Sequence, residues 1–451
     1  MLRDNSFLDP FIKIGVPIAL QNLFIASLGI VDTIMVGQLG DTSIAAVGLA
    51  SQIAFLMTFT LFGIHTGAAI FTAQYWGNQD IPGIRRVLGT CLTFGLIVCL
   101  VFSIIALGFP TQALSIYTHD PAVIHLGSDY LYFVGLSYLA TTLIACYTST
   151  LRSINRVRVP VMIGITTLCL KTLLNYLLIF GHLGLPQLGV RGAAWATTLT
   201  QWIECLVLLV YVYASRCAAA ARIKELLAFN RRFLGVYLGV AFPVFINELL
   251  WSIGSSMYNA IYARIGTESV AAVSIALTII NLAGVIFAGI STACGIMVGN
   301  AIGAGDSSKA LLIARRSLTI AGLLALVIFG VLLAVRSPAI NLYRLSPLAH
   351  QQAYNVLTVL SFVIFFRAFN PTIIVGILRS GGDTRFSAIL DVSAVWLVGV
   401  PLASLLAFVF HLPIQWVVIG VLGEGLFKSS IGLYRVASGK WIHNLTHTSR
   451  A

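Results

Sequence analysis

Charged residues are scarce in this chain of 451 residues: Asp, Glu, Lys and Arg make up only 9% of it. A soluble globular domain carries about a quarter of such residues. Hydrophobic residues make up 58% of the chain, and the mean hydropathy is +0.95. This composition excludes a soluble enzyme or binding domain of this length. It predicts an all-α integral membrane protein that crosses the bilayer many times.

Motifs that would indicate a catalytic or metal site are also missing. The seven cysteines contain no CxxC pair and the eight histidines form no HExxH pattern, so we expect neither a disulfide framework nor a metal site. The segments GEGLFKSS (423–430) and SGKW (438–441) lack the GxxxxGK[ST] spacing of a phosphate-binding loop, which argues against an ATP-driven pump. A membrane transferase is expected to have paired acids or histidines near a helix end, and the sequence has no such pair. We therefore expect neither an enzyme nor a bound cofactor.

The net charge of +12 follows from the expected topology and does not indicate a nucleic-acid partner. The first apolar run is too long for a signal peptide and is expected to remain as a span. Most Lys and Arg side chains fall at the N-terminus, in the even-numbered loops and at the C-terminus, which predicts that both termini are cytoplasmic. Apolar runs of about 20–30 residues predict twelve spanning helices. They lie near residues 10–37, 44–75, 87–109, 122–150, 159–181, 189–214, 233–263, 269–301, 311–335, 350–378, 386–410 and 413–434.

An internal repeat relates the two halves of the chain. Shifting the sequence by 226 residues aligns Pro17 with Pro243 and places DTSIAAVGLA (41–50) on TESVAAVSIA (267–276). The repeat covers six spans, an even number, so the halves are expected to share one orientation and a pseudo-two-fold axis along the membrane normal. The expected parts are an N-terminal lobe (1–214), a cytoplasmic linker (215–232) and a C-terminal lobe (233–451).

Several stretches together resemble the multidrug and toxic compound extrusion (MATE) family. They are GVPIALQNLFIASLGIVDTIMVGQLG, LNYLLIFG, GVRGAAWAT, VGILRSGGDTRF and RVASGKW. The resemblance covers essentially the whole chain and is closer to the DinF-type branch than to the NorM-type branch. It implies a V-shaped antiporter of the bacterial inner membrane that exports organic, often cationic, amphiphiles in exchange for H⁺ or Na⁺ by rocker-type alternating access. Its expected partners are small-molecule substrates and the lipid bilayer, and it is expected to act as a monomer.

Asp32 is the candidate residue for binding the coupling ion. It lies in the apolar run GIVDTIMVG, and a carboxylate in the middle of a bilayer costs about 2.5–3.5 kcal/mol. At the same spacing from Pro17, it matches the first-span aspartate at which MATE proteins bind this ion. The resemblance also implies that Asn175 and Thr197 face this aspartate. The alternative is an acid near the membrane interface that is wetted and merely tolerated.

Lys171 is an unexpected neighbour of this site. Some relatives carry asparagine at its position and a second aspartate at the position of Asn175. Lys171 and Asn175 are four residues apart and share a helix face. A lysine paired with Asp32 would supply internally the positive charge that Na⁺ would otherwise bring, which favours H⁺ coupling. The alternative is a lysine whose side chain extends to the membrane interface.

Glu248 is the candidate coupling-ion residue of the second half, by analogy with a seventh-span glutamate of other MATE branches. Arg367 and Asn370 lie deep in the tenth span. Because an unpaired arginine is costly at that depth, Glu248 or Asp391 is its expected partner. This ion pair either locks the C-terminal lobe or lines a cavity that selects the charge of the substrate.

For other residues the sequence indicates a role less strongly. Trp251 and Tyr258 are candidates for a cavity wall that binds flat cations by stacking, although lipid-facing or core packing explains single aromatic rings equally well. Glu204 and Glu424 are expected to form hydrogen bonds that stabilise their lobes. Asp383, in GGDTR (381–385), is expected to act as a turn and helix cap.

A lipid or lipid-linked oligosaccharide flippase is the main alternative function, because relatives with similar lobes perform that task. Such a flippase typically needs a strongly cationic cavity for pyrophosphate. Only Lys171 and Arg367 are expected at depth, against several acids, which favours cationic or neutral amphiphiles as substrates. A non-transporting scaffold would have no use for a duplicated set of buried charges.

Overall fold

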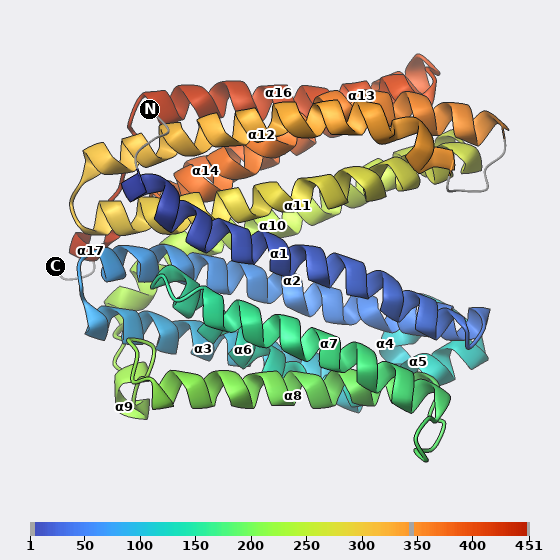
Figure 1. The fold of residues 1–451 in the computed structure, drawn as a ribbon, viewed down its shortest axis with the longest axis horizontal. Coiled ribbons are helices and arrows are strands. Elements are labelled where there is room, and N and C mark those ends of the chain that lie inside the picture. The colour runs from blue at the N-terminus through green and yellow to red at the C-terminus, as the bar shows by residue number, and fades with distance from the viewer. Residues whose placement is uncertain (1–4, 342–346, 449–451) are drawn as a thin grey trace. The chain divides into compact units, whose positions relative to one another are not determined.

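A computed structural model describes residues 5–341 and 347–448, and its secondary structure there is helical apart from one β-bridge between Gly382 and Ile442 (Figure 1). In the first half the helices are α1 (Asn5–Gly37), α2 (Asp41–Gly77), α3 (Ile81–Ser103), η1 (Ile104–Gly108), α4 (Pro110–Ser115), α5 (Pro121–Gly135), α6 (Tyr138–Ser153), α7 (Arg158–Phe180), α8 (Val190–Ala214) and α9 (Ile223–Leu226), where η marks a π-helical segment. In the second half they are α10 (Arg231–Ile265), α11 (Thr267–Gly303), α12 (Ser307–Asn341), α13 (Pro347–Pro371), η2 (Thr372–Arg379), α14 (Thr384–Ser393), η3 (Ala394–Gly399), α15 (Val400–Ser404), η4 (Leu405–Val409), α16 (Ile414–Ala437) and α17 (Leu445–Thr448).

The lengths and composition of these helices confirm the all-α membrane fold. In the described ranges, 11 helices are long and apolar enough to cross a membrane, and the bent pair α5–α6 brings the number of spans up to 12. α5 and α6 are bent by 49° where they meet, and there the Ser137 hydroxyl donates to the Val134 carbonyl at 2.7 Å. Large apolar side chains such as Leu100 and Val210 are exposed, as expected for helix faces in contact with lipid.

The chain divides into two compact units. We call Leu20–Ala241 the N-terminal unit, and Met1–Ala19 together with Phe242–Ala451 the C-terminal unit. Both boundaries lie inside helices, α1 and α10, whereas the sequence had suggested boundaries at either end of a linker over 215–232. These helices have 33 and 35 residues, or about 50 Å at 1.5 Å per residue, so each is long enough to contribute one part to each unit.

The segment between α8 and α10 is attached to α3 within the N-terminal unit. Arg85 on α3 donates to the Glu225 carboxylate at 2.5 Å and to the Ala218 carbonyl at 3.3 Å. The Arg222 backbone N–H and then the Arg85 side chain hold the pKa of Glu225 below its usual value. This linker contains the short helix α9, which includes Glu225.

Helices α7 and α8 pack closely in the N-terminal unit because Gly192 has no side chain. A Cβ atom at this position would lie 2.5 Å from the Leu178 carbonyl oxygen. Nearby, Val36 of α1 forms a buried apolar cluster with Ile179 and Ala193. These contacts fix the end of α1 against α7 and α8, and thereby fix the helix register around Asp32.

In the C-terminal unit, α13 continues into the π-helical segment η2 directly after Pro371. The Pro371 carbonyl accepts a hydrogen bond from the Ser291 hydroxyl of α11 at 2.7 Å. At Gly376 of η2, an added Cβ would lie 2.9 Å from the Ser291 carbonyl, so α11 packs directly on η2. π-Helical turns re-aim side chains relative to an α-helix, and η2 ends with the buried side chain of Arg379.

We predict that Gly192→Ala destabilises the protein by about 1–3 kcal/mol, because the new methyl group overlaps backbone atoms that cannot move alone. Thermal unfolding of the detergent-solubilised chain measures this loss. Gly48→Ala in α2 is the matched control, because nothing lies within 4 Å of its added Cβ; it should be neutral or stabilising by up to about 1 kcal/mol. Equal unfolding temperatures for the two variants would contradict the prediction.

Candidate functional site

Asp32 is held by two side chains of α7 in the N-terminal unit. Lys171 Nζ donates to Asp32 Oδ2 at 2.7 Å, and Asn175 Nδ2 donates to Asp32 Oδ1 at 2.8 Å. The Asp32 side chain is 18% exposed and that of Lys171 is 26% exposed. The predicted pairing of Lys171 with Asp32 is therefore present, and the i,i+4 spacing of Lys171 and Asn175 allows both to reach one carboxylate.

These contacts are those of an ionised carboxylate with a built-in counter-charge. Each oxygen of Asp32 accepts from a different side chain. A metal cation that bound Asp32 in this arrangement would be repelled by the ammonium group of Lys171, which lies 2.7 Å from Oδ2. A proton binds one carboxylate oxygen and cancels the charge to which Lys171 is attracted.

Thr197, expected to face Asp32, forms its hydrogen bond elsewhere. Its hydroxyl donates to the Ala193 carbonyl of its own helix, α8, at 3.0 Å. The side chains that the structure joins to Asp32 are Lys171 and Asn175, both from α7. A threonine in a helix commonly satisfies its hydroxyl in this way, so the spacing of Thr197 alone did not fix its partner.

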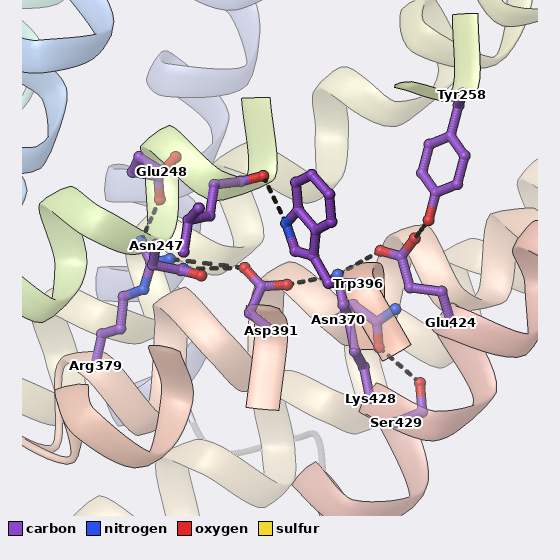
Figure 2. Close-up of polar contacts among 11 residues, drawn as sticks. Asn247, Glu248, Tyr258, Asn370, Arg379, Asp391, Trp396, Glu424, Lys428 and Ser429 are labelled. Atoms are coloured by element: carbon purple, nitrogen blue, oxygen red, sulfur yellow. Dashed lines mark hydrogen bonds and ion pairs between the residues drawn. The ribbon is translucent and has the colours of Figure 1, made fainter. Parts of the chain in front are cut away.

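The C-terminal unit contains a larger network of buried charges (Figure 2). Arg379 donates to the Glu248 carboxylate at 2.6 Å and lies 4.0 Å from Asp391. Lys428 bridges Asp391 and Glu424, at 2.5 Å to each. Three carboxylates thus share two cationic side chains, and the side chains of Arg379 and Lys428 are only 2% and 5% exposed.

Neutral donors complete this network. The Tyr258 hydroxyl donates to Glu424, and Asn247 Nδ2 donates to Asp391 at 3.0 Å. Every carboxylate of the network therefore accepts at least one hydrogen bond from a side chain of this network. With all members ionised, three negative and two positive charges leave one surplus negative charge inside the C-terminal unit.

The expected partner of Arg367 is wrong. Its guanidinium donates to Asn281 Oδ1 at 2.6 Å, and both proposed partners, Glu248 and Asp391, instead contact Arg379. The sequence assigned Arg379 to a loop after the tenth span, but η2 extends that span to Arg379. Asn370 accepts a hydrogen bond from the Ser429 hydroxyl at 2.8 Å, beside the network (Figure 2).

The aromatic candidates have different surroundings in the structure. Tyr258 belongs to the charged network through Glu424. Trp251 is 41% exposed and makes no ring contact with another described aromatic side chain. Trp396 donates its indole N–H to the Leu250 carbonyl at 3.2 Å and lies beside the network (Figure 2).

Lys428 and Arg379 were missed as deep cations, so the expectation that only Lys171 and Arg367 lie at depth is wrong. The segment GEGLFKSS lacks the spacing of a phosphate-binding loop, but it contains the i,i+4 pair Glu424 and Lys428 inside a predicted span. An acid and a base one helical turn apart in an apolar segment is a signal that such a pair is buried together.

Asp383 stands at the N-terminal end of α14, but its side chain makes no capping hydrogen bond there. It accepts a hydrogen bond from Arg435 Nε at 2.8 Å, and the Arg435 guanidinium lies over the Phe386 ring at 4.6 Å. The predicted cap is therefore wrong. The carboxylate instead joins the start of α14 to the end of α16.

The sequence profile of the MatE family matches residues 17–177 and 243–405, which together are more than half of the chain. The chain belongs to the MatE family. The two matches begin at Pro17 and Pro243, the same pair that the 226-residue shift aligns. The family unit is therefore present twice, which confirms the internal repeat. MatE proteins are transporters, so the chain is a transporter and not an enzyme.

Named relatives of this MatE protein align with nearly its whole length. A probable multidrug resistance protein NorM from Thermotoga maritima is 24% identical and covers 95% of this chain and 92% of its own. Multidrug resistance protein PmpM from Pseudomonas aeruginosa is 26% identical, with 89% and 84% covered. The probable multidrug resistance protein YoeA from Bacillus subtilis is 24% identical, with 90% and 88% covered.

Solved structures show the same fold. One is a MATE protein in complex with MaL6, and another is an outward-facing conformation of a multidrug resistance MATE family transporter. Each has a TM-score of 0.87 and 20% identity, and covers 96% of both chains. A transporter of the MOP superfamily from Pyrococcus furiosus, described as having a binding pocket of reversed polarity, gives a TM-score of 0.86 over 96% of both chains. This likeness confirms the two-lobed MATE fold.

We predict that Lys428→Met in this MatE protein lowers its stability by about 3–5 kcal/mol, because it leaves Asp391 and Glu424 buried without their shared cation. Chemical unfolding in detergent measures the loss. Lys13→Met is the matched control in the same unit, because Lys13 also forms an i,i+4 pair, with Asp9, but both side chains are more than half exposed. Its effect should be below about 1 kcal/mol. If Lys428→Met lost as little stability as Lys13→Met, the result would contradict the burial of this network.

Proposed function

We propose that this MatE protein is a secondary active antiporter that exports organic, often cationic, amphiphilic compounds in exchange for protons. The names of relatives such as NorM and PmpM, which describe multidrug resistance proteins, support export of such compounds. The observation that carries proton coupling is the Lys171–Asp32–Asn175 contact. Asp32 already has a cation beside it that would repel a metal ion, so a proton is the ion that we propose to exchange there.

The coupling follows from two alternative states of this pair. When Asp32 is ionised, Lys171 is attached to it and α1 is joined to α7. When Asp32 is protonated, the ion pair loses its Coulomb attraction and Lys171 is free to adopt another position. A proton therefore changes the free energy of contact between the two helices, and two conformations that differ in this contact will differ in proton affinity. This difference is what a rocker-type alternating-access cycle requires.

The proposal includes the finer expectations from the sequence. Both termini face the cytoplasm, on the basis of the positions of Lys and Arg, the protein lies in the bacterial inner membrane, and it acts as a monomer. The coupling ion is the only cofactor that we propose. Its N-terminal site resembles the DinF-type branch through Asp32 and Asn175, although several relatives of similar identity carry the name NorM.

A flippase for lipids or lipid-linked oligosaccharides is the second candidate. The description of the Pyrococcus furiosus relative says that the reversed polarity of its binding pocket suggests a different function. Two deep cations beyond those expected, Arg379 and Lys428, at first favour an anionic substrate. Both, however, contact carboxylates that outnumber them. The network therefore favours cationic over pyrophosphate-bearing substrates.

We predict that Asp32→Asn reduces proton-driven ethidium export at least about tenfold, because the amide cannot exchange a proton. The purified chain is reconstituted into proteoliposomes, and ethidium flux is measured with an imposed ΔpH or an imposed Na⁺ gradient. Asp41→Asn, at the exposed start of α2, is the matched control and should transport as the wild type does. ΔpH-driven flux that persists in Asp32→Asn would overturn the assignment, and flux driven only by Na⁺ would overturn proton coupling.

We also predict that Lys171→Ala changes the pH dependence of transport. Removing the ammonium group takes away the positive charge that contacts Asp32 at 2.7 Å, so the pH profile of transport should shift. Lys171→Arg keeps the charge and should keep the wild-type profile. Initial rates of ethidium export between about pH 6 and pH 8 test this shift around neutrality. An unchanged profile in Lys171→Ala would remove Lys171 from the mechanism.

A further inference from the structure

A second group of polar side chains lies in the N-terminal unit, beside the Asp32–Lys171 pair. Arg152 on α6 donates to Gln21 Oε1 on α1 at 2.6 Å. Thr167 on α7 donates to Glu204 Oε2 on α8 at 2.9 Å. Four helices thus contribute one polar side chain each. Glu204, expected only to stabilise its lobe, receives a single side-chain hydrogen bond.

Gly164 brings these two hydrogen-bonded pairs together. An added Cβ at this position would lie 2.5 Å from Gln21 Nε2 and 3.5 Å from Glu204 Oε1. The amide of Gln21 and the carboxyl group of Glu204 therefore occupy the space that a side chain at 164 would fill. The glycine makes one continuous polar group out of two pairs on different helices.

Glu204 differs in its charge balance from the four carboxyl groups of the two sites described above. Asp32, Glu248, Asp391 and Glu424 each contact a Lys or Arg side chain within 4.0 Å, whereas Glu204 makes no ion pair of that kind with the described residues. It lies ten residues before the end of α8 at Ala214, or about 15 Å inside the helix end. A permanently ionised, unpaired carboxylate is costly at such a depth, and a carboxyl group that takes up and releases a proton avoids that cost.

Thr167 can accommodate both protonation states of Glu204. Its hydroxyl lies within hydrogen-bond distance of the Glu204 carboxylate and also of the Ile163 carbonyl, at 3.0 Å. A hydroxyl has one proton to donate and two lone pairs to accept. It donates to Glu204 when that group is ionised; when Glu204 carries a proton, the hydroxyl can accept from it and donate to Ile163 instead.

The polar group connects to Asp32 along one face of α7. Thr167, Lys171 and Asn175 follow one another at four-residue intervals, so they lie on the same side of the helix, about 6 Å apart along its axis. The far end of the Lys171 side chain contacts Asp32. The Thr167–Glu204 contact therefore lies one turn of α7 from the lysine that contacts Asp32.

The repeat shows how this arrangement differs from its counterpart in the C-terminal unit. The 226-residue shift aligns Gln21 with Asn247, and Arg152 is one position from alignment with Arg379. In the C-terminal unit the arginine contacts the Glu248 carboxylate. In the N-terminal unit the arginine contacts an amide. In the C-terminal unit the arginine at this place in the repeat is thus neutralised by an ion pair. In the N-terminal unit the arginine contacts an amide, and an exchangeable carboxyl group, that of Glu204, lies nearby.

We propose that Glu204 is a second proton-carrying carboxyl group, which receives the proton that Asp32 releases and passes it towards the Arg152 end of the unit. This inference rests on the proton coupling proposed at Asp32. In the step, Asp32 loses one proton and becomes a carboxylate, while the Glu204 carboxylate gains that proton and becomes a neutral acid. The two groups together keep one proton and one negative charge, so no net charge is created in the membrane.

The neighbouring groups are compatible with this role. The positive charge of Arg152 on α6 acts on the Glu204 carboxyl group and favours return of its proton to a base. On α8 the adjacent thiol, Cys205, is buried, and it is also close to Tyr147 on α6. On α5 the acid Asp129 is paired with Arg191, at the opposite end of α8, at 2.7 Å.

The test compares two transport modes of the full chain in proteoliposomes, with ethidium as the probe. Glu204→Gln should lower ΔpH-driven export at least about tenfold, because the amide cannot carry the proton onward. Ethidium counterflow without a pH gradient should stay within about twofold of the wild type, because exchange of ethidium for ethidium moves no net proton. Glu225→Gln, an acid of the same unit outside the spans, is the matched control and should change neither rate.

Each other outcome overturns the inference. Wild-type ΔpH-driven export by Glu204→Gln excludes Glu204 from the proton route while leaving Asp32 coupling intact. Parallel loss of export and counterflow shows that Glu204 only stabilises the unit. If the wild type itself shows no ΔpH-driven export, the proposed function fails, and this inference fails with it.

Thr167 gives an independent check on the route. Thr167→Val removes the hydroxyl and should slow ΔpH-driven export about tenfold while sparing counterflow, whereas Thr167→Ser should export like the wild type. Thr200→Val is the matched control, because the buried Thr200 hydroxyl contacts only backbone carbonyls of α8. Wild-type export by Thr167→Val would overturn the role of the hydroxyl as a relay.

Discussion

The contact between Lys171 and Asp32 is the interaction on which the N-terminal site depends. A carboxylate in an apolar span is costly unless a cation or several donors compensate it, and here the compensation comes from a helix 139 residues away in the sequence. It requires α1 and α7 to keep a fixed register, which the packing of Val36 against Ile179 and the close approach at Gly192 provide. The packing of these helices therefore determines which charges come together. Protonation of Asp32 would in turn weaken the contact between α1 and α7.

The two units share a scaffold and differ in their charges. The 226-residue shift aligns Asp32 with Tyr258, and Tyr258 itself reaches a buried network by donating to Glu424. The same place in the repeat thus supplies an acid in one unit and a neutral donor in the other. In the C-terminal unit the carboxylates and cations contact one another directly and are nearly fully buried. In the N-terminal unit a single ion pair, Asp32–Lys171, is present instead, and its side chains are 18% and 26% exposed.

The sequence predicted the spans and the contact of Lys171 with Asp32 because both depend on local patterns. Hydropathy finds helices, and the four-residue spacing of Lys171 and Asn175 places two donors on one face. The C-terminal network could not be predicted in the same way, because its contacts depend on helix rotation and on the π-helical segment before Arg379. Tyr258 and Glu424 are 166 residues apart. The partner of Arg367 was predicted wrongly for the same reason. A deep arginine needs a partner, but its position in the sequence does not show that the partner is Asn281 and not an acid.

Stability alone gives little reason to keep buried ion pairs in either unit. Replacing a buried pair with apolar side chains of similar size is often neutral or stabilising, because the desolvation cost cancels most of the Coulomb attraction. What an apolar core cannot provide is a charge that persists inside the membrane. With Glu248, Asp391 and Glu424 all ionised, the one negative charge that Arg379 and Lys428 do not balance would attract cations and repel phosphates. Under the proposed function, the network would favour cationic substrates, and the proton proposed to exchange at Asp32 would couple their export to the proton gradient.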